Sequence, residues 1–399
     1  MRIAYLGRFP FPGSTAATQR VRGVAKALTL AGHDVTIVPM ISGDREDAGE
    51  LTIDCSLARP AISRSADNAL EMLFGGGGVV AWLTAHATDV DAGILYGTPA
   101  AALLRYLGRS RQRTFNLPPL VLDVVEWYAY SHRPGGAVGP YAAEHAISMN
   151  LLAPRVGHAI CISTSLATHF AAHGCQTVVV PPLREPIADV NPARLTPGLI
   201  HIGYAGSPGA KDGPGLRNLL QAAGALPEQL RSKLQIQIVG LDQRRGEELL
   251  GRSSSPQTLN SSLIRWHGRV RTVEAQAIVA ACNFTFLQRP AARYAMAGFP
   301  TKVVESLALG TPVITNLTSD LGSCVFDGRN GVILDARSEQ GASPEAVARA
   351  LEHVLAPGFR LSLDRSQIQE LSNSQFHPMH YAERLDGFLR SVVTASDSA

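Results

Sequence analysis

Lys211 lies in sequence surroundings that suit the recognition of a phosphorylated ligand. It belongs to the stretch GSPGAKDG, between an apolar run and an amphipathic run, and its neighbours include Gly206, Gly209 and Gly213. Glycines let backbone amides approach a ligand closely, and the ammonium group of a lysine attracts phosphate. The loop lacks the pattern G-x-x-x-x-G-K-[ST], so it is not a P-loop. It indicates a diphosphate site, with a solvated surface loop as the alternative.

The stretch GFPTKVVESLALGTP predicts a short helix over residues 302–309. Its apolar residues share one face, namely Val303, Val304, Leu307 and Ala308. Thr301 is the expected N-cap, and Gly310 and Pro312 end the helix. The loop before the helix can turn its amides toward an anion, and it contains Gly298, Phe299 and Pro300. We therefore expect a second phosphate contact where this helix begins.

Glu305 lies one turn into the same helix, on the side away from the apolar face. A carboxylate in that position can accept hydrogen bonds from the two adjacent hydroxyls of a ribose. The alternative is a glutamate that is only solvated at the surface.

Polar residues also follow strand-like runs in the first half of the chain. LDVVEWYAYSHRPGG places Asp123, Glu126 and His132 at or after the end of a strand, where titratable groups can face a cleft. Glu126 is the first candidate there and His132 the second, while a helix cap and a loop histidine are the alternatives for Asp123 and His132. FPFPGSTAATQR carries Gly13 and Ser14 after the first strand, as a ligand-facing turn or as a plain connection.

The elements that must position these residues are short apolar strands that alternate with helices. Strands that are apolar on both faces and are separated by helices predict parallel sheets with helices covering both faces. In the first half such runs fall at residues 2–7, 31–40, 92–97, 120–125, 158–163 and 177–182. After a proline-rich linker they recur at residues 199–207, 234–240, 263–270, 283–288, 311–316 and 331–335. Two doubly wound α/β domains are therefore expected.

The domain boundaries follow from this pattern. We expect an N-terminal domain over 1–183, a linker over 184–198, a second domain over 199–375 and a terminal helical segment over 376–399 that could pack back on the first domain. Open α/β sheets bind ligands at the carboxyl ends of their strands, so the active site is expected in a cleft between the two domains.

Composition excludes several classes of protein. The chain has 399 residues, of which 45% are hydrophobic and 17% charged, which is typical of a folded enzyme and not of a disordered or coiled-coil protein. A net charge of +3 is too small for a protein that binds duplex nucleic acid. The five scattered cysteines form no CxxC pair, and apolar runs stop short of the about 20 residues that span a membrane. A cytoplasmic location is expected.

Taken together, these motifs resemble the GT-B glycosyltransferases of the large retaining group called family 4. The resemblance rests on FPFPGS, EWYAYSHRPGG, YAGSPGAKDG, WHGRV, GFPTKVVESLALGTPVITN and DGRNGVILD, and it spans nearly the whole chain. It implies two Rossmann-like domains, the first for the acceptor and the second for a nucleotide diphosphate sugar. It also implies a hexosyltransferase that retains configuration and needs no cofactor besides its donor substrate. The charge of the departing diphosphate can be stabilised by Lys211, by a cleft arginine such as Arg289 or Arg293, and by the amides before the helix, so no divalent metal is expected.

The resemblance assigns roles to individual residues. Glu305 would hold the ribose and Lys211 the diphosphate, while Glu126 is the acceptor-side candidate for catalysis. The other residues expected at the donor are Gly13, Ser14, Gly206, Ser207, Arg269, Val270, Arg289, Gly298, Phe299, Pro300, Thr301 and Lys302. Where the family has a glutamate that touches the transferred sugar, this chain has Ala297, and Lys302 is expected to replace some of the lost contacts.

The expected partners are a nucleotide-sugar donor and a saccharide or lipid-linked acceptor, in bacterial surface polysaccharide or glycoconjugate synthesis. A basic run could contact the inner face of an anionic membrane, unless it is only a solvated face: Arg105, Arg109, Arg111 and Arg113. The rival functions are a non-catalytic GT-B binding protein, which Ala297 would permit, a GT-B sugar-nucleotide epimerase, and a two-domain solute-binding protein, which the missing export signal disfavours.

Overall fold

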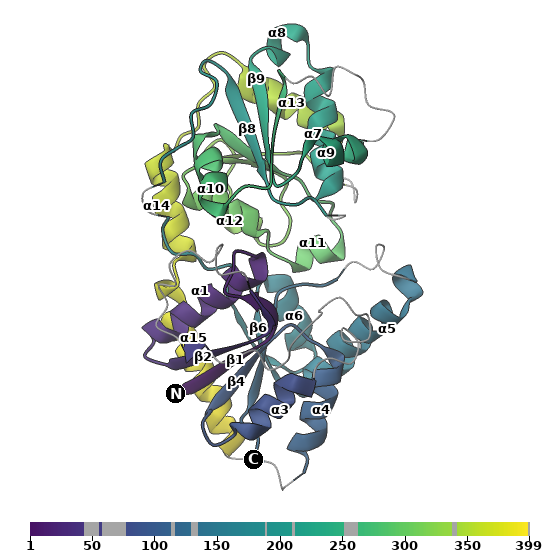
Figure 1. Ribbon diagram of the computed structural model, residues 1–399, viewed down its shortest axis with the longest axis vertical. Coiled ribbons are helices and arrows are strands. Elements are labelled where there is room, and N and C mark those ends of the chain that lie inside the picture. The colour runs from purple at the N-terminus through teal and green to yellow at the C-terminus, as the bar shows by residue number, and fades with distance from the viewer. Residues whose placement is uncertain are drawn as a thin grey trace. The chain divides into compact units, whose positions relative to one another are not determined.

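The computed structural model describes residues 1–43, 56–57, 77–112, 116–128, 135–187, 190–209, 212–250, 262–336 and 341–397. These residues form two compact units, each built around a parallel sheet (Figure 1). Unit 1 consists of Met1–Glu185, Ala297–Phe299 and Phe376–Ala399, and unit 2 consists of Pro186–Met296 and Pro300–Gln375. The last helix therefore belongs to the same unit as the first strand.

The sheet of unit 1 contains seven described strands, in the order β3-β2-β1-β4-β5-β6-β7, and all of them pair in parallel. Their bounds are β1 (Arg2–Phe11), β2 (Asp34–Ser42), β3 (Ser56–Leu57), β4 (Ala92–Tyr96), β5 (Leu120–Val124), β6 (His158–Cys161) and β7 (Gln176–Val179). The chain moves outward from β1 to β2 and β3, then crosses to the other side of β1 to form β4. This reversal is the point at which doubly wound sheets usually bind ligands.

Helices cover this sheet on both faces (Figure 1). They are α1 (Ala16–Leu30), α3 (Gly77–Ala85), α4 (Ala100–Ser110), α5 (Pro140–Ile147), α6 (Thr164–Ala172) and α15 (Met379–Asp397), with the short turns η1 (Gly136–Val138), η2 (Ser148–Leu152) and η3 (Ala153–Arg155). Thr15 caps α1 by accepting a hydrogen bond from the amide of Thr18 at 3.2 Å. The final helix packs against α1 and adds four side chains at helical spacing to the core: Leu385, Phe388, Leu389 and Val392.

The sheet of unit 2 repeats the plan with six described strands, in the order β10-β9-β8-β11-β12-β13. Their bounds are β8 (Ile200–Ala205), β9 (Leu234–Val239), β10 (Ile264–Gly268), β11 (Phe284–Leu287), β12 (Val313–Thr315) and β13 (Gly331–Ile333). All pairs are parallel, and the order reverses between β8 and β11. The carboxyl ends of β8 and β11 are therefore the expected ligand edge of this unit.

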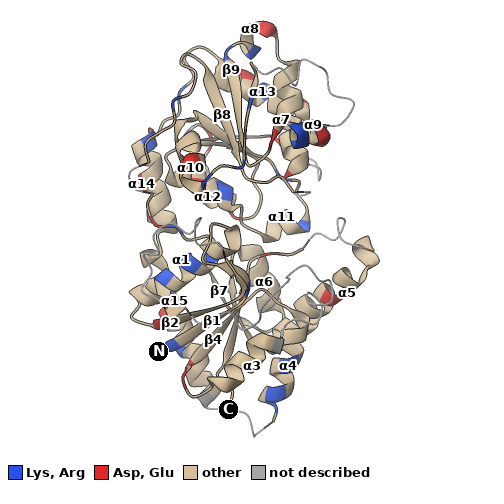
Figure 2. Cartoon of the chain, viewed as in Figure 1, with Lys and Arg blue, Asp and Glu red and all other residues tan. Residues whose placement is uncertain are grey.

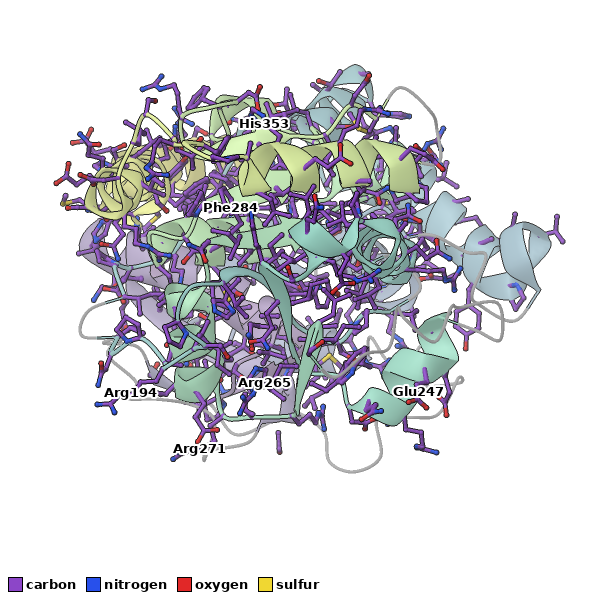
Figure 3. All side chains as sticks on the ribbon, turned by 90° about the horizontal axis from the view of Figure 1, so that it is seen from above. Arg194, Glu247, Arg265, Arg271, Phe284 and His353 are labelled. Carbon is purple, nitrogen blue, oxygen red and sulfur yellow. The ribbon has the colours of Figure 1, made fainter. Side chains whose placement is uncertain are left out.

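The helices of unit 2 enclose an apolar core. They are α7 (Gly213–Ala225), α8 (Glu228–Arg231), α9 (Gln243–Leu250), α10 (Thr272–Ala281), α11 (Arg293–Ala297), α12 (Thr301–Ala308), α13 (Pro344–Leu355) and α14 (Arg365–Phe376), with the turn η5 (Leu321–Ser323). The neighbours α7 and α13 contribute Leu219 and Val347 to the core beside Ile236. Figure 3 shows Phe284 in the interior near α13, whereas Arg271 projects outward.

The predicted fold is confirmed: two parallel α/β sheets form the two Rossmann-like domains of a GT-B fold. Each apolar run that predicts a strand overlaps one. Figure 2 shows most charged residues on the helices and loops of each unit, with the strands largely uncharged. In the described part of the chain, no helix combines the length and the apolar character needed to cross a bilayer.

Candidate functional site

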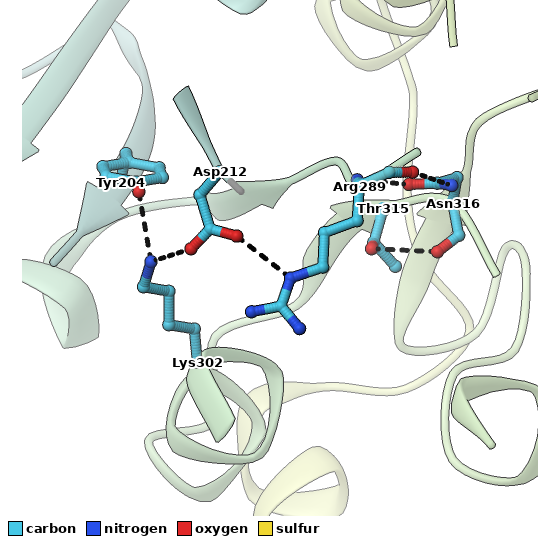
Figure 4. A network of polar contacts seen from close by, with 6 residues as sticks. All are labelled: Tyr204, Asp212, Arg289, Lys302, Thr315 and Asn316. Carbon is cyan, nitrogen blue, oxygen red and sulfur yellow. Dashed lines mark hydrogen bonds and ion pairs between the residues drawn. The ribbon is translucent and has the colours of Figure 1, made fainter. Parts of the chain in front are cut away.

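A network of charged and polar side chains lies at the ligand edge of the sheet in unit 2 (Figure 4). Tyr204 is in β8, Asp212 immediately precedes α7, Arg289 follows β11 and Lys302 is in the first turn of α12. The four residues come from different elements, and the switch in strand order brings them together. This edge is where the fold favours a ligand.

Asp212 is the centre of the network, although it is only 7% exposed. Its Oδ1 accepts a hydrogen bond from Nε of Arg289 at 3.0 Å, and its Oδ2 accepts one from Nζ of Lys302. Burial alone would raise the pKa of Asp212, but the positive charges of Lys302 and Arg289 hold it below its usual value. Asp212 is thus ionised, and the cluster of three charged groups carries one net positive charge.

Lys302 lies across the end of β8. Its Nζ donates to the hydroxyl of Tyr204 at 3.1 Å and lies 4.8 Å from the centre of the Tyr204 ring. The stem passes so close to Gly206 that a Cβ there would be 2.6 Å from Cε of Lys302, and Gly206 has a φ of 130°. Only glycine suits both the backbone angle and the close approach. Gly206 is therefore needed to admit Lys302 to the site.

The backbone of Arg289 is fixed by the side chain of Asn316. Its amide donates to Oδ1 of Asn316 at 2.9 Å, and its carbonyl accepts from Nδ2 of the same side chain at 2.7 Å. Asn316 follows β12 and is 2% exposed, so the pair of bonds ties the loop after β11 to the neighbouring strand. The guanidinium is thus presented from a rigid support.

The loops after β8, β9 and β10 are also hydrogen-bonded side by side. The amide of Gly206 donates to the carbonyl of Val239 at 2.9 Å, and the amide of Gly240 donates to the carbonyl of Gly268 at 2.7 Å. Ser207 and Arg269 come next in these loops and are exposed. Val270 packs its side chain against an apolar cluster with Val239 and Ile278, so any contact of Val270 with a ligand would involve its backbone.

The helix of the GFPTKVVESLALGTP stretch is α12, and it begins one residue earlier than predicted. Thr301 is its first residue and not its N-cap; Pro300 takes the cap position and provides no side-chain acceptor. The amide of Val303 donates to the carbonyl of Pro300 at 3.1 Å, so an anion at this helix start would meet the amides of Thr301 and Lys302. Glu305 lies half-buried on the same helix, one turn beyond Lys302, while Val303, Val304 and Leu307 form the buried face.

The remaining predicted donor residues are placed as follows. Gly298 and Phe299 are buried just before α12, and the Phe299 ring meets the Phe376 ring edge-on at 6.0 Å. Ala297 is 2% exposed, so a buried methyl group stands at the position where the sequence resemblance would lead us to expect a glutamate. Lys211 lies outside the described residues, and its role remains a prediction.

In unit 1 the predicted candidates lie at the carboxyl ends of the first and fifth strands. Gly13 and Ser14 lie between β1 and α1, and Glu126 is half-buried two residues after β5. His132 falls outside the part of the chain that the structure describes. The structure brings Gly206, Arg289 and Lys302 together in unit 2, whereas Glu126, Gly13 and Ser14 belong to the other unit.

Asp123 differs from the expectation of a cleft-facing group or a helix cap. It is fully buried at the end of β5, where it accepts hydrogen bonds from the Tyr5 hydroxyl and from Nη2 of Arg20 at 2.7 Å. Nη1 of Arg20 donates to the carbonyls of Val180 and Pro181 at 2.6 and 2.8 Å. Asp123 is therefore part of a structural ion pair.

His145 and His169 surround Trp127 edge-on, at 5.8 and 4.8 Å between ring centres. His145 is 3% exposed, and burial lowers its pKa to about 4. Its Nε2 accepts a hydrogen bond from the amide of Tyr128 at 3.3 Å. Among the described residues, no group of three or more His, Cys, Asp and Glu side chains is placed to hold a metal ion.

Comparisons with known proteins agree with this fold. Residues 200–356 match the family model described as Glycosyl transferases group 1. No curated protein matches the chain by sequence. The region that matches contains Tyr204, Asp212, Arg289 and Lys302.

Solved structures resemble the whole chain at low sequence identity. HepE of Anabaena, solved in complex with UDP, is 18% identical, with a TM-score of 0.66 over 98% of this chain and 100% of that chain. Sucrose-phosphate synthase from Thermosynechococcus elongatus is 18% identical, with a TM-score of 0.69 over 99% of both chains. The lipopolysaccharide outer core galactosyltransferase WaaB is 15% identical, with a TM-score of 0.62 over 98% of this chain and 99% of that chain. Residues 200–356 thus match the group 1 glycosyl transferases, within a chain that has the GT-B fold throughout.

Proposed function

We propose that the protein is a glycosyltransferase that moves a sugar from a nucleotide diphosphate sugar to a hydroxyl acceptor. The observation that carries the proposal is the pair of cations, Lys302 and Arg289, at the ligand edge of unit 2, inside the region that matches the transferase family. The resemblance to HepE, which was solved with UDP, UDP and glucose, and UDP-glucose, supports a nucleotide-sugar donor.

The chemical difficulty of this reaction is the departing nucleoside diphosphate. Breaking the bond between the anomeric carbon and the diphosphate oxygen leaves the electron pair, and a further negative charge, on that oxygen. Fixed donors stabilise such charge without reorganising. Lys302, Arg289 and the first amides of α12 can supply them, and Lys211 is the further cation predicted from the sequence. These groups support a mechanism that does not depend on a divalent metal ion.

Glu305 is the proposed ligand of the nucleotide ribose. It lies one turn along α12 from Lys302, so one short helix can contact the diphosphate at its start and the ribose at its middle. A half-buried carboxylate can accept hydrogen bonds from both ribose hydroxyls. Bonds to a charged acceptor are stronger than neutral ones, which suits a group that determines donor affinity.

Retention of configuration is part of the proposal, on the strength of the sequence resemblance to the retaining group. The acceptor hydroxyl would give its proton to the departing phosphate, with Glu126 as the second candidate for a base. Gly13 and Ser14 are proposed to face the donor phosphates or the acceptor. Their place after the first strand of unit 1 supports this, because ligands bind at that edge of a doubly wound sheet.

A second candidate function is a GT-B protein that binds a nucleotide sugar without transferring the sugar. The buried Ala297 favours it, because the related glutamate that would touch the sugar is missing. Measuring the release of nucleoside diphosphate separates the two functions. We expect thermal stabilisation by one of a panel of nucleotide sugars, followed by diphosphate release that needs an acceptor. Stabilisation without any release, over a wide panel of acceptors, would favour the binding protein.

The acceptor is proposed to be a saccharide or lipid-linked saccharide of a bacterial surface polysaccharide or glycoconjugate. Contact with an anionic membrane would suit such a substrate, and α4 supports it by presenting Leu104, 57% exposed, beside the exposed Arg105. Arg109 instead donates to Oγ1 of Thr84 at 2.9 Å, and Arg113 lies outside the described residues. In a sedimentation assay the wild-type protein should pellet with phosphatidylglycerol vesicles. A variant that carries both Leu104→Ser and Arg105→Ser should stay in the supernatant. Phosphatidylcholine vesicles are the control.

A further inference from the structure

The two cations of the proposed diphosphate site already share an anion that belongs to the chain. Asp212 divides its oxygens between them, with Oδ1 on Nε of Arg289 at 3.0 Å and Oδ2 on Nζ of Lys302 (Figure 4). The carboxylate is 7% exposed, so water screens its charge only weakly. A ligand phosphate that binds these cations must do so close to a fixed negative charge.

We propose that Asp212 is a built-in counter-ion that weakens the binding of the nucleoside diphosphate product and so speeds its release. This inference rests on the proposed function. Asp212 has two roles in this inference: it positions Lys302 and Arg289 by direct contact, and its charge acts on the ligand phosphate without touching it.

The geometry lets Asp212 orient the cations without using all of their donors. Arg289 contacts the carboxylate through Nε, and among the described residues its two Nη groups make no hydrogen bond, so they can contact a ligand. Nζ of Lys302 gives one hydrogen to Asp212 and one to the Tyr204 hydroxyl, which leaves the third. The site therefore keeps donors for a phosphate while its positive charge is partly neutralised.

The charge of the two nucleotides explains why the effect falls mainly on the product. The donor carries a diphosphate that is esterified at both ends. After transfer, the freed terminal phosphate carries a further negative charge near neutral pH. Repulsion from the Asp212 carboxylate grows with that charge, so the carboxylate raises the free energy of the bound product more than that of the bound donor. Without Asp212, the two cations would bind the more highly charged product more tightly than the donor.

Asp212→Asn tests the inference, because it removes the charge and nearly keeps the shape. Calorimetry first determines which of UDP, ADP, GDP and inorganic pyrophosphate binds the wild-type protein most tightly. The same ligand should bind Asp212→Asn at least about fivefold more tightly at low ionic strength, and the gain should shrink in salt. Glu248→Gln is the matched control, since it removes one negative charge from the exposed face of α9, and it should change the dissociation constant less than about twofold.

Steady-state kinetics test the preference for product. In Asp212→Asn the inhibition constant of the nucleoside diphosphate should fall by a larger factor than the KM of the nucleotide sugar. Asp212→Ser provides a second neutral variant, in case the amide of asparagine disturbs folding, which thermal unfolding would reveal. Unchanged or weaker diphosphate binding in a folded neutral variant would overturn the inference alone. A wild-type protein that binds none of the four ligands would overturn the proposed function as well.

Discussion

Glu305 gives the most direct test of donor recognition at the scale of single residues. Glu305→Ala should weaken binding of the nucleotide-sugar donor by about 1.5 to 3 kcal/mol, because it removes a charged acceptor for two hydroxyls. Glu305 is on the half-buried side of α12, so the fold should persist. Calorimetry with the best donor measures the change. Glu352→Ala, at an exposed position of α13, is the control, and an equal affinity in the two variants would refute the ribose role.

Lys302 should act on the reaction as well as on binding. Its interaction strengthens as the diphosphate leaves, so Lys302→Met should lower kcat/KM by about 100-fold, with part of the loss in kcat. Steady-state kinetics with a matched donor and acceptor measure both parameters. Lys233→Met removes an exposed lysine of the same unit and should leave them nearly unchanged. A normal kcat in Lys302→Met would exclude a role for Lys302 in stabilising the leaving group.

The site residues were predictable from sequence only where a local pattern marks them. Gly206, Lys302 and Arg289 belong to such patterns, and the structure brings them together. Asp212, Tyr204 and Asn316 were missed. The only signal for Asp212 is its place beside Lys211 in a glycine-rich loop, because the partner that fixes its role, Lys302, is 90 residues away in the chain. Residues that pair over such a long distance in the chain form no local sequence pattern from which the pair could be predicted.

At the scale of elements, the buried ion pair of unit 1 should matter more than any exposed pair. Arg20 and Asp123 join α1 to β5, and Arg20 also binds the backbone after β7. Asp123→Ala would leave the Arg20 guanidinium buried without its counter-charge, at a cost of about 3 to 5 kcal/mol. Chemical denaturation measures the loss. Asp91→Ala breaks the largely exposed pair with Arg2 and should cost much less.

The same ion pair shows which parts of the fold the sequence could reveal. Strands were predictable because apolar runs are local, and the six-residue run 120–125 indeed contains β5. The function of Asp123 within that strand was not, because Arg20 and Tyr5 lie 103 and 118 residues away. The start of α12 was misplaced by one residue for a local reason: Thr301 is a good cap by type, but Pro300 already has the extended conformation of the cap position.

At the scale of the whole molecule, buried histidines should make stability fall in mild acid. Burial lowers the pKa of His145 to about 4 from an ordinary value of 6.5, so between these values the unfolded chain binds a proton that the folded chain excludes. The stabilisation is complete above pH 6.5 and is lost as the pH falls toward 4, in all by about 3 kcal/mol. Burial also lowers the pKa of His33, His158, His267 and His377, which adds to the same trend.

His145→Gln tests this pH dependence, because glutamine keeps an acceptor for the Tyr128 amide but does not titrate. Denaturation curves between pH 4 and 7 should show a shallower slope for this variant than for the wild type, by up to about 1.4 kcal/mol per pH unit. His353→Gln, at an exposed position of α13, is the matched control. Parallel slopes for wild type and His145→Gln would contradict the assignment.

The proposed metal independence concerns the complete protein, and chelation tests it. Because Lys302, Arg289 and the amides of α12 can offset the charge of the leaving group, turnover should survive an excess of EDTA. Diphosphate release is measured with and without the chelator. Complete loss of activity that magnesium or manganese restores would show that a metal shares the task.

The position of α15 bears on how the protein is made. This helix supplies Leu385, Phe388, Leu389 and Val392 to the core around β1 and α1, yet residues 186–375 are translated between the two parts. At common rates of translation, that interval lasts on the order of 10 s or longer. During it, the apolar surface of α1 that α15 will cover is open to chaperones on the ribosome. Closure of the first unit therefore waits until nearly the whole chain, including the second unit, has been translated.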